Sequence, residues 1–197
     1  MPVMSVALID DERLVGCVAA AGDGSKNEKL LPAIDWVLSE ANIQRAQLSC
    51  IAVTRGPGSF TGTRVGLATA QGLALALGVP LLAMGTHEAA AETSEAGRVV
   101  VSGEAGREEL YVSLFERRKL VRGPELLPRT QLQVLELESD QSLVVESLSG
   151  RFNLALLCAR RALRLEREGQ SALHGDSTPL YVRLAEAEVQ LQLRQVR

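Results

Sequence analysis

A glycine-rich turn is the part of this sequence whose residue types best suit chemistry. The apolar run at 51–53 leads through Gly56-Pro57-Gly58-Ser59 into a long helical pattern. Glycine permits positive φ and close backbone approach, and Ser59 or Thr61 can accept hydrogen bonds from the first helix amides. These amides and the helix dipole favour an anion, so the sequence predicts a weak anion site at Gly56, Gly58, Ser59, Thr61 and Gly62. The spacing matches neither dinucleotide-binding nor phosphate-loop patterns, and a tight turn without a ligand is the alternative.

The histidines do not support a hydrolase. There are 2 of them, His87 and His174, and neither begins the His-x-x-x-His spacing of zinc proteases. Ser59 lies in a Gly-x-Ser-x-x turn, which differs from the Gly-x-Ser-x-Gly elbow of serine hydrolases. We therefore expect no catalytic residue and no metal site, and we interpret His87 as a helix cap or surface group.

The net charge and the cysteines indicate which partners the protein can bind and in which cellular compartment it works. The net charge is -3, with acidic and basic residues mixed along the 197 positions, which argues against a protein that binds nucleic acid alone. Cys17, Cys50 and Cys158 share no metal-type spacing and indicate buried free thiols in a reducing compartment. We find no signal-peptide pattern and no spanning stretch of about 20 apolar residues. The sequence predicts a cytoplasmic protein that does not enter a membrane.

Charged clusters have an ordinary and a functional interpretation. An acid-base pair could come from carboxylates that we expect to lie on an exposed turn, namely Glu104, Glu108 and Glu109. The pattern over 153–168 predicts a helix with a basic face made of Arg160, Arg161, Arg164 and Arg167. We expect this face to be solvated and paired with Glu166 and Glu168, although in a complex it could lie near RNA.

Alternating helical and strand patterns predict an α/β protein. In the first half we expect a hairpin of 5–9 with 14–19, a helix over 28–42, a strand over 48–53 buried on both sides, a helix over 63–77, a strand over 81–84 and a short helix capped by Thr86-His87-Glu88. Gly78 suits the left-handed end of the longer helix, and Pro80 prevents its continuation.

A change of composition at 93–98 predicts a seam between two lobes. Beyond it we expect a meander of strands over 99–102, 109–115 and 119–122, ambiguous segments over 131–136 and 143–148, the arginine-rich helix, and a last strand over 179–183.

Small residues recur every fourth position in the helix that follows the glycine turn. Gly62, Gly66, Ala70 and Ala74 therefore share one face, along which another helix could approach closely. A glycine inside a helix costs roughly 1 kcal/mol relative to alanine, so some packing must offset this loss. The ordinary explanation is packing inside the chain; the other is a partner interface and a dimer. The candidate interface comprises Leu31, Ile34, Leu38, Gly62, Gly66, Ala70, Leu73 and Ala74.

The same residues carry a resemblance to a known family. The run Gly56-Pro57-Gly58-Ser59-Phe60-Thr61-Gly62, with Arg64, Gly66, Ala70 and Gly78-Val79-Pro80, resembles the TsaB family, also called YeaZ. Supporting matches follow in order at Ser5-Val6-Ala7-Leu8, Glu28-Lys29-Leu30-Leu31-Pro32, Glu88-Ala89, Glu108-Glu109-Leu110-Tyr111-Val112 and Pro179-Leu180-Tyr181-Val182-Arg183. The similarity covers almost the whole chain, and the glycine turn is its most specific part.

The resemblance implies an actin-like, ribonuclease H-like α/β fold with lobes at 1–97 and 98–197. It implies a non-catalytic subunit that supports a TsaD-like enzyme, with a TsaE-like ATPase, in threonylcarbamoyl transfer to adenosine 37 of tRNA. It further implies a homodimer when the protein is alone, contacts through the helices at 28–42 and 63–77, and tRNA contact only within the complex. The alternative is an autonomous glycoprotease-like or nucleotide-dependent enzyme.

The chain departs from the family pattern before Ser5. Family members carry there a strand that ends in an Asp-Thr-Ser turn, and this element is missing from the present sequence. In the wider fold that turn holds phosphates and metal, so we expect no cofactor and at most weak nucleotide binding. We also expect the first sheet to lack a central strand. Lys26-Asn27-Glu28 stands where the family tends to carry a histidine, so we expect no metal there.

Overall fold

The computed structural model describes residues 3–21, 26–145, 153–170 and 176–182. The elements are β1 (Val3–Asp10), β2 (Arg13–Ala21), α1 (Lys26–Glu40), a 3-10 turn (Arg45–Gln47), β3 (Ile51–Thr54), α2 (Phe60–Leu77), β4 (Leu81–Met84), α3 (Thr86–Ala91), β5 (Arg98–Gly106), β6 (Glu109–Glu116), β7 (Lys119–Pro128), α4 (Arg129–Leu137), β8 (Gln141–Val144) and α6 (Leu154–Arg167). Within these ranges, no helix combines the length and the apolar character that a membrane span requires.

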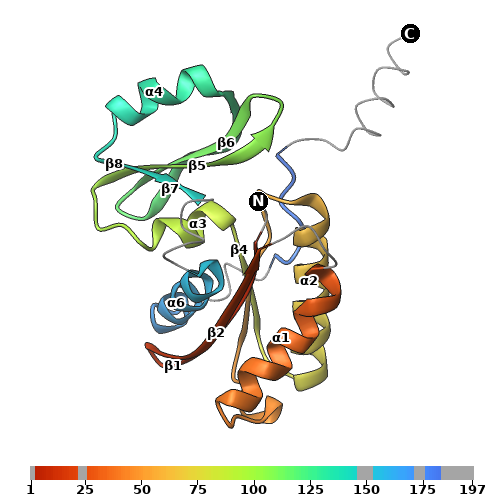
Figure 1. The fold of residues 1–197 in the computed structure, drawn as a ribbon. Helices are drawn as coiled ribbons and strands as arrows, with labels where there is room; N and C mark the ends of the chain where they lie inside the picture. The colour runs from red at the N-terminus through yellow and green to blue at the C-terminus, as the bar shows by residue number, and fades with distance from the viewer. Residues whose placement is uncertain (1–2, 22–25, 146–152, 171–175, 183–197) are drawn as a thin grey trace.

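The first lobe has three layers. β1 and β2 form the predicted antiparallel hairpin, and β3 pairs in parallel with β4, so that Ile51 lies opposite Leu81. Helices α1 and α2 cover one side of these strands, and α6 covers the other side (Figure 1).

The middle layer is divided. In the part of the chain that the structure describes, β1–β2 and β3–β4 are separate two-stranded sheets. The side chains of β3 are only half-buried, whereas those of β4 from Leu82 to Met84 are at most 2% exposed. The prediction that the strand at 48–53 is buried on both sides was therefore wrong, because its edge toward β1 is open.

The second lobe is a mixed sheet with the strand order β7-β6-β5-β8. The antiparallel meander β5–β6–β7 was predicted. The first ambiguous segment lies in α4; residues 143 and 144 of the second end β8, which is parallel to β5, and residues 146–148 lie outside the described residues. One core lies between this sheet and β4, α3 and α6, with Met84, Phe115 and Leu165 at most 1% exposed. A smaller core joins the other face of the sheet to Leu135 of α4.

The predicted lobe boundary needs correction. We expected 98–197 to form the second lobe, but α6 packs on β1, β3 and α3 of the first lobe. The segment 176–182 also returns there, because the Leu180 N–H donates to the carbonyl oxygen of Arg55 at 2.7 Å. Pro179 to Val182 form no strand, and Arg183 lies outside the described residues.

The arginines of α6 explain its position. Arg161 and Arg164 donate to the Glu92 carboxylate next to α3, at 3.2 and 2.5 Å, and the Glu92 side chain is only 9% exposed. Arg167 pairs with Asp11 and Glu12 in the β1–β2 turn. These partners correct the expectation of a solvated face paired with Glu166 and Glu168: much of the basic face ties α6 to the first lobe.

Candidate partner-docking surface

The glycine turn joins three segments at the end of β3. Gly56 has a φ of 108°, and its carbonyl oxygen accepts the Thr86 N–H at 2.7 Å, at the start of α3. A Cβ on Gly56 would lie 2.9 Å from the Leu180 carbonyl oxygen. The Arg55 guanidinium also pairs with Asp176 at 2.8 Å. Glycine is therefore needed at 56 because the returning segment passes directly over the backbone.

The predicted capping of α2 is confirmed for Ser59. Its hydroxyl accepts the Gly62 N–H at 3.2 Å, and Gly78 ends the helix with a φ of 66°. Gly58, Thr61 and Gly62 border the large cavity of the first lobe together with Ser59. Since Ser59 already satisfies one helix amide, the turn has a structural role, and the weak anion site there stays a prediction. The expected capping of the short helix α3 is confirmed for Glu88, which accepts the Gly85 N–H at 3.0 Å, but the N-cap is Gly85 and Thr86 is the first helical residue.

An aromatic and basic cluster lies beside this turn. Arg64 donates from Nε to the Tyr181 hydroxyl at 2.5 Å, and its guanidinium carbon lies 3.8 Å from the centre of the Phe60 ring. The two rings are 5.4 Å apart, and Phe60 and Tyr181 are 46% and 43% exposed. This cluster was not predicted, because Arg64 and Tyr181 are separated by 117 residues in the sequence.

The small-residue ridge of α2 faces the sheet. Ala70 and Ala74 are 6% and 7% exposed, and a Cβ on Gly66 would lie 3.9 Å from Cγ2 of Val53 in β3. Packing inside the chain, the first of the two explanations, accounts for the burial of Ala70 and Ala74, whereas Gly66 is half-buried and its place in a partner interface stays a prediction. Leu38 of α1 is also buried, at 6%, and is withdrawn from the interface for the same reason. Ile34 and Leu73 are half-buried and line the cavity.

A second series of small residues occupies the outer face of α2. Ala68, Gly72 and Ala76 are exposed, and a Cβ on Gly72 would meet nothing within 4 Å. Leu75 beside them is 85% exposed.

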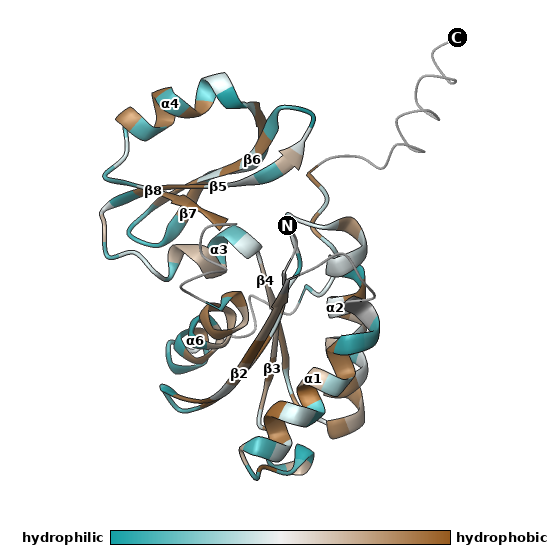
Figure 2. Cartoon of the chain, in the orientation of Figure 1, coloured by the Kyte–Doolittle hydropathy of each residue, from teal (hydrophilic) through white to brown (hydrophobic). Residues whose placement is uncertain are grey.

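The neighbouring helix α1 continues this surface. It contributes Trp36, at 51% exposure, and the predicted Leu31, at 53%. Figure 2 shows hydrophobic segments on α1 and α2, on the side of the first lobe away from α6. We call Leu31, Trp36, Ala68, Gly72 and Leu75 the outer face; exposed apolar side chains gathered on adjacent helices are typical of an interface.

Groups that could act as catalysts are shielded. His87 is 3% exposed and shares a hydrogen bond of 2.8 Å with the Ser113 hydroxyl, so our interpretation of it as a cap or surface group was wrong. Burial lowers the pKa of His87 to about 4, which keeps the ring neutral at pH 7. Burial raises the pKa of Cys50 to about 11 and that of Cys158 to about 12, so both remain protonated thiols. Cys17, by contrast, is exposed, contrary to our expectation of buried thiols.

The acidic turn behaves as a surface feature. Glu104 pairs with Arg129, Glu108 lies 3.9 Å from the same guanidinium, and the Glu104 and Glu108 side chains are 50% and 94% exposed. Across the described residues, no group of His, Cys, Asp and Glu gathers in a way that could hold a metal ion.

Comparisons with known proteins agree with this architecture. Residues 23–127, more than half of the chain, match the family model described as "TsaD: tRNA N6-adenosine threonylcarbamoyltransferase". The chain is 27% identical to the "tRNA threonylcarbamoyladenosine biosynthesis protein TsaB" of Bacillus subtilis, over 94% of this chain and 91% of that protein. It is 37% identical to the protein of the same name from Haemophilus influenzae, over 47% of this chain and 41% of that protein.

A solved structure supports the same assignment at the level of the fold. "YeaZ from Pseudomonas aeruginosa" superimposes with a TM-score of 0.72 at 23% identity, over 91% of this chain and 94% of that chain. The two-lobed actin-like α/β fold that the sequence predicted is thus confirmed. Together with the glycine turn, the capped α2 and the match to the family model, these similarities show that the chain belongs to the TsaB (YeaZ) family of TsaD-like proteins.

Proposed function

We propose that this protein is a non-catalytic partner subunit that binds a TsaD-like enzyme and supports threonylcarbamoyl transfer to adenosine 37 of tRNA. In this proposal it works in the cytoplasm with a TsaE-like ATPase, contacts tRNA only within the complex, and forms a homodimer when alone. The names of its relatives place them in the biosynthesis of threonylcarbamoyladenosine. The observation that carries the proposal is the outer face of α1 and α2.

The outer face suits the docking of another helical surface. Leu75, Trp36 and Leu31 place large apolar groups in solvent at 85%, 51% and 53% exposure. Ala68 and Gly72 are exposed and, by helical spacing, share the face of α2 with Leu75, where small residues allow a partner helix to approach closely. Burial of such side chains contributes about 25 cal/mol per Å² of apolar surface. In this proposal the interface lies on α1 and α2, the helices that we predicted, but on the opposite side of α2.

The shielded groups support a subunit more than an autonomous enzyme. His87 is neutral at pH 7, is 3% exposed and shares a hydrogen bond with Ser113 of β6. The carboxylates Glu92 and Glu104 are held in ion pairs with arginines. Activity on tRNA would then depend on residues of the partner enzyme.

Reconstitution tests the proposal. We would mix the purified chain with the TsaD-family protein and the TsaE-type ATPase of the same organism, and measure complex formation by light scattering and threonylcarbamoyladenosine in tRNA by mass spectrometry. Leu75→Asp should abolish both the complex and the modification. Leu137→Asp is the matched control, because Leu137 is 88% exposed on α4 of the second lobe and lies off the outer face. Product formation by the chain alone, or equal loss in both variants, would contradict the proposal.

A further inference from the structure

The segment 176–182 runs along one side of α2. Gln71 donates from its amide nitrogen to the carbonyl oxygen and to the hydroxyl of Ser177, at 3.1 and 3.0 Å. Arg64, two turns earlier in the helix, donates from Nε to the Tyr181 hydroxyl at 2.5 Å. Because residues seven apart share one side of a helix, these contacts place the segment along the side of α2 that carries Arg64 and Gln71.

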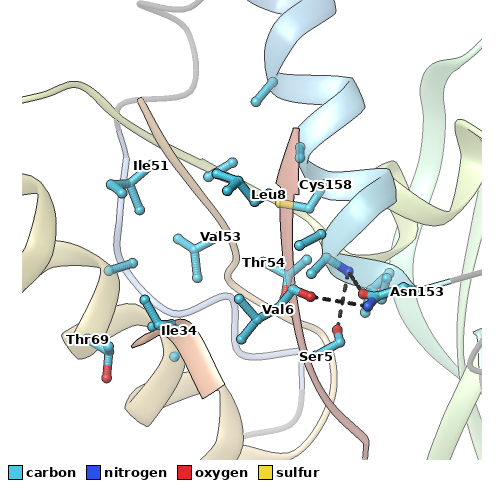
Figure 3. A pocket seen from close by; sticks show the side chains of 18 of the residues that line it. Ser5, Val6, Leu8, Ile34, Ile51, Val53, Thr54, Thr69, Asn153 and Cys158 are labelled. Atoms are coloured by element: carbon cyan, nitrogen blue, oxygen red, sulfur yellow. Dashed lines mark hydrogen bonds between the residues drawn. The ribbon is translucent and has the colours of Figure 1, made fainter. Parts of the chain in front are cut away.

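Helix α1 packs against another side of α2. Thr69 of α2 and Ile34 of α1 line the same cavity (Figure 3). Successive residues of a helix are rotated by about 100°, so the exposed Ala68 and Gly72 project between the side that meets α1 and the side that meets the segment 176–182. The small residues of the outer face are therefore bordered by α1 and by this segment.

Arg64 stands at this border with part of its guanidinium unpaired. Its Nε donates to Tyr181, and the Phe60 ring centre lies 3.8 Å from the guanidinium carbon, so the group is held in one orientation. Neither contact supplies a negative charge. Arg55 pairs with Asp176 of the same segment, whereas no carboxylate of the described residues pairs with the exposed Arg64, and its two terminal nitrogens have no partner among them.

A guanidinium held in this way is suited to bind a carboxylate. Its planar, parallel N–H groups match the two oxygens of a carboxylate and form charge-assisted hydrogen bonds with them. Because Phe60 and Tyr181 already fix the side chain, little rotamer entropy is lost on binding. The two rings are themselves 46% and 43% exposed, and Tyr and Arg are enriched among the residues that contribute most to protein interfaces.

We propose that Arg64 binds a carboxylate of the TsaD-like partner, at the edge of the helical contact made by the outer face. This inference rests on the proposed function and adds the charge that the partner must carry. Leu75 follows Arg64 on nearly the same side of α2, about 16 Å further along the helix axis. A partner helix that packs along α2 must therefore present an Asp or Glu about three turns away from the apolar side chains that meet Leu75.

RNA phosphate is the other anion that a guanidinium commonly binds, but the surroundings of Arg64 favour a protein. Surfaces that bind nucleic acid use several basic side chains that follow the backbone. Helix α2 carries a single charged residue, Arg64 itself. The exposed side chains beside it, Phe60, Tyr181 and Leu75, are aromatic or apolar, as in the centre of protein interfaces.

Partner binding at different salt concentrations tests this role of Arg64. We would measure the dissociation constant for the purified TsaD-family protein by isothermal titration between about 50 and 500 mM NaCl, without tRNA. Arg64→Gln should weaken binding about 10- to 100-fold at low salt and make the dependence on salt shallower than in the wild type. Arg160→Gln is the matched control: Arg160 is exposed on α6, across the first lobe from α2 (Figure 1), and its loss should change the constant by less than about threefold.

Tyr181→Phe separates the charge of Arg64 from the attachment of the segment 176–182. It removes the hydroxyl that holds Nε, but it keeps both rings and the positive charge. A charge contact predicts a smaller loss of affinity than in Arg64→Gln, with the wild-type dependence on salt. Equal losses in the two variants, both with the wild-type dependence on salt, would show that Arg64 only fastens the segment, and would overturn the proposal.

Leu75→Asp separates this inference from the proposed function. If Leu75→Asp abolishes the complex while Arg64→Gln binds as tightly as the wild type, the proposed function stands and the role of Arg64 falls. If the wild-type chain forms no complex, both fall. Binding of tRNA by the chain alone that is lost in Arg64→Gln would assign the site to phosphate and would also overturn the proposal. Loss of binding in Arg64→Glu, restored by the exchange of one acidic residue of the partner for lysine, supports the proposal and identifies the carboxylate.

Discussion

The Leu180 N–H donates to the carbonyl oxygen of Arg55 at 2.7 Å, and this bond brings Leu180 directly over Gly56. The Leu180 carbonyl oxygen occupies the space that a Cβ on Gly56 would need, at 2.9 Å. The glycine turn, α3 and the segment 176–182 are thereby held as one unit at the end of β3.

Gly56→Ala should destabilise the protein by on the order of 1–3 kcal/mol, because alanine at a φ of 108° is strained and its Cβ meets the Leu180 oxygen. Chemical unfolding measures the change. Gly72→Ala is the control: it adds a Cβ in open space inside α2 and should raise stability by up to about 1 kcal/mol. Equal stability of the two variants would contradict the described packing of Leu180.

Because the small-residue ridge of α2 faces the sheet, two substitutions of Gly66 should have opposite effects on the stability of the protein. Gly66→Ala should be tolerated or stabilising by up to about 1 kcal/mol, because its Cβ would meet Val53 at an ordinary contact distance of 3.9 Å. Gly66→Leu should cost about 1–3 kcal/mol through overpacking against β3. Thermal unfolding of both variants checks this, and a harmless leucine at 66 would show that the ridge faces solvent.

The buried His87 should make the folded protein less stable in acid. Its folded pKa of about 4 lies below the ordinary value of 6.5, so the unfolded chain binds the proton more readily. The stabilising contribution is complete above pH 6.5 and falls as the pH drops toward 4, by up to about 1.4 kcal/mol per pH unit. Urea unfolding between pH 7 and 4.5 should show a shallower decline for His87→Gln, which keeps a polar group near Ser113. Identical slopes for both proteins would refute this role of His87.

The ion pairs of Glu92 with Arg161 and Arg164 should contribute strongly to the attachment of α6 to the first lobe. Glu92→Gln should cost about 1.5–3 kcal/mol, because it leaves Arg161 and Arg164, which are 14% and 29% exposed, without their carboxylate. Glu95→Gln is the matched control: Glu95 pairs with Arg118 but is 89% exposed, so the change should stay below about 1 kcal/mol. Denaturant midpoints compare the two, and similar losses would argue against a buried attachment.

Local signals in the sequence were enough to predict most of the helices and strands. Gly78 ended α2 in the left-handed conformation, Ser59 capped it, and the alternating runs around the charged turn at 10–13 formed the first hairpin. These features depend on a few neighbouring residues, so their physical causes are visible in the sequence.

The orientation of α2 could not be derived in this way. Gly66, Ala70 and Ala74 form one series of small residues, and Ala68, Gly72 and Ala76 form another on the opposite side. Periodicity alone does not say which series meets the sheet, and the leucines are distributed around the whole helix. The return of α6 to the first lobe was missed for a related reason, since Arg164 and Glu92 are 72 residues apart.

Asn153 links the first hairpin to α6 and so affects how these two elements unfold. Its side chain caps α6 by accepting the Ala155 N–H at 2.9 Å, and at the same time holds Val6 and Val18 of the hairpin. Among the described residues the hairpin has no ladder to β3, so packing on α1 and α6 attaches it to the rest of the protein, and the Asn153 amide ties it to the start of α6. The amino-terminal hairpin and a helix some 147 positions later should therefore detach together, as one cooperative unit drawn from both ends of the chain.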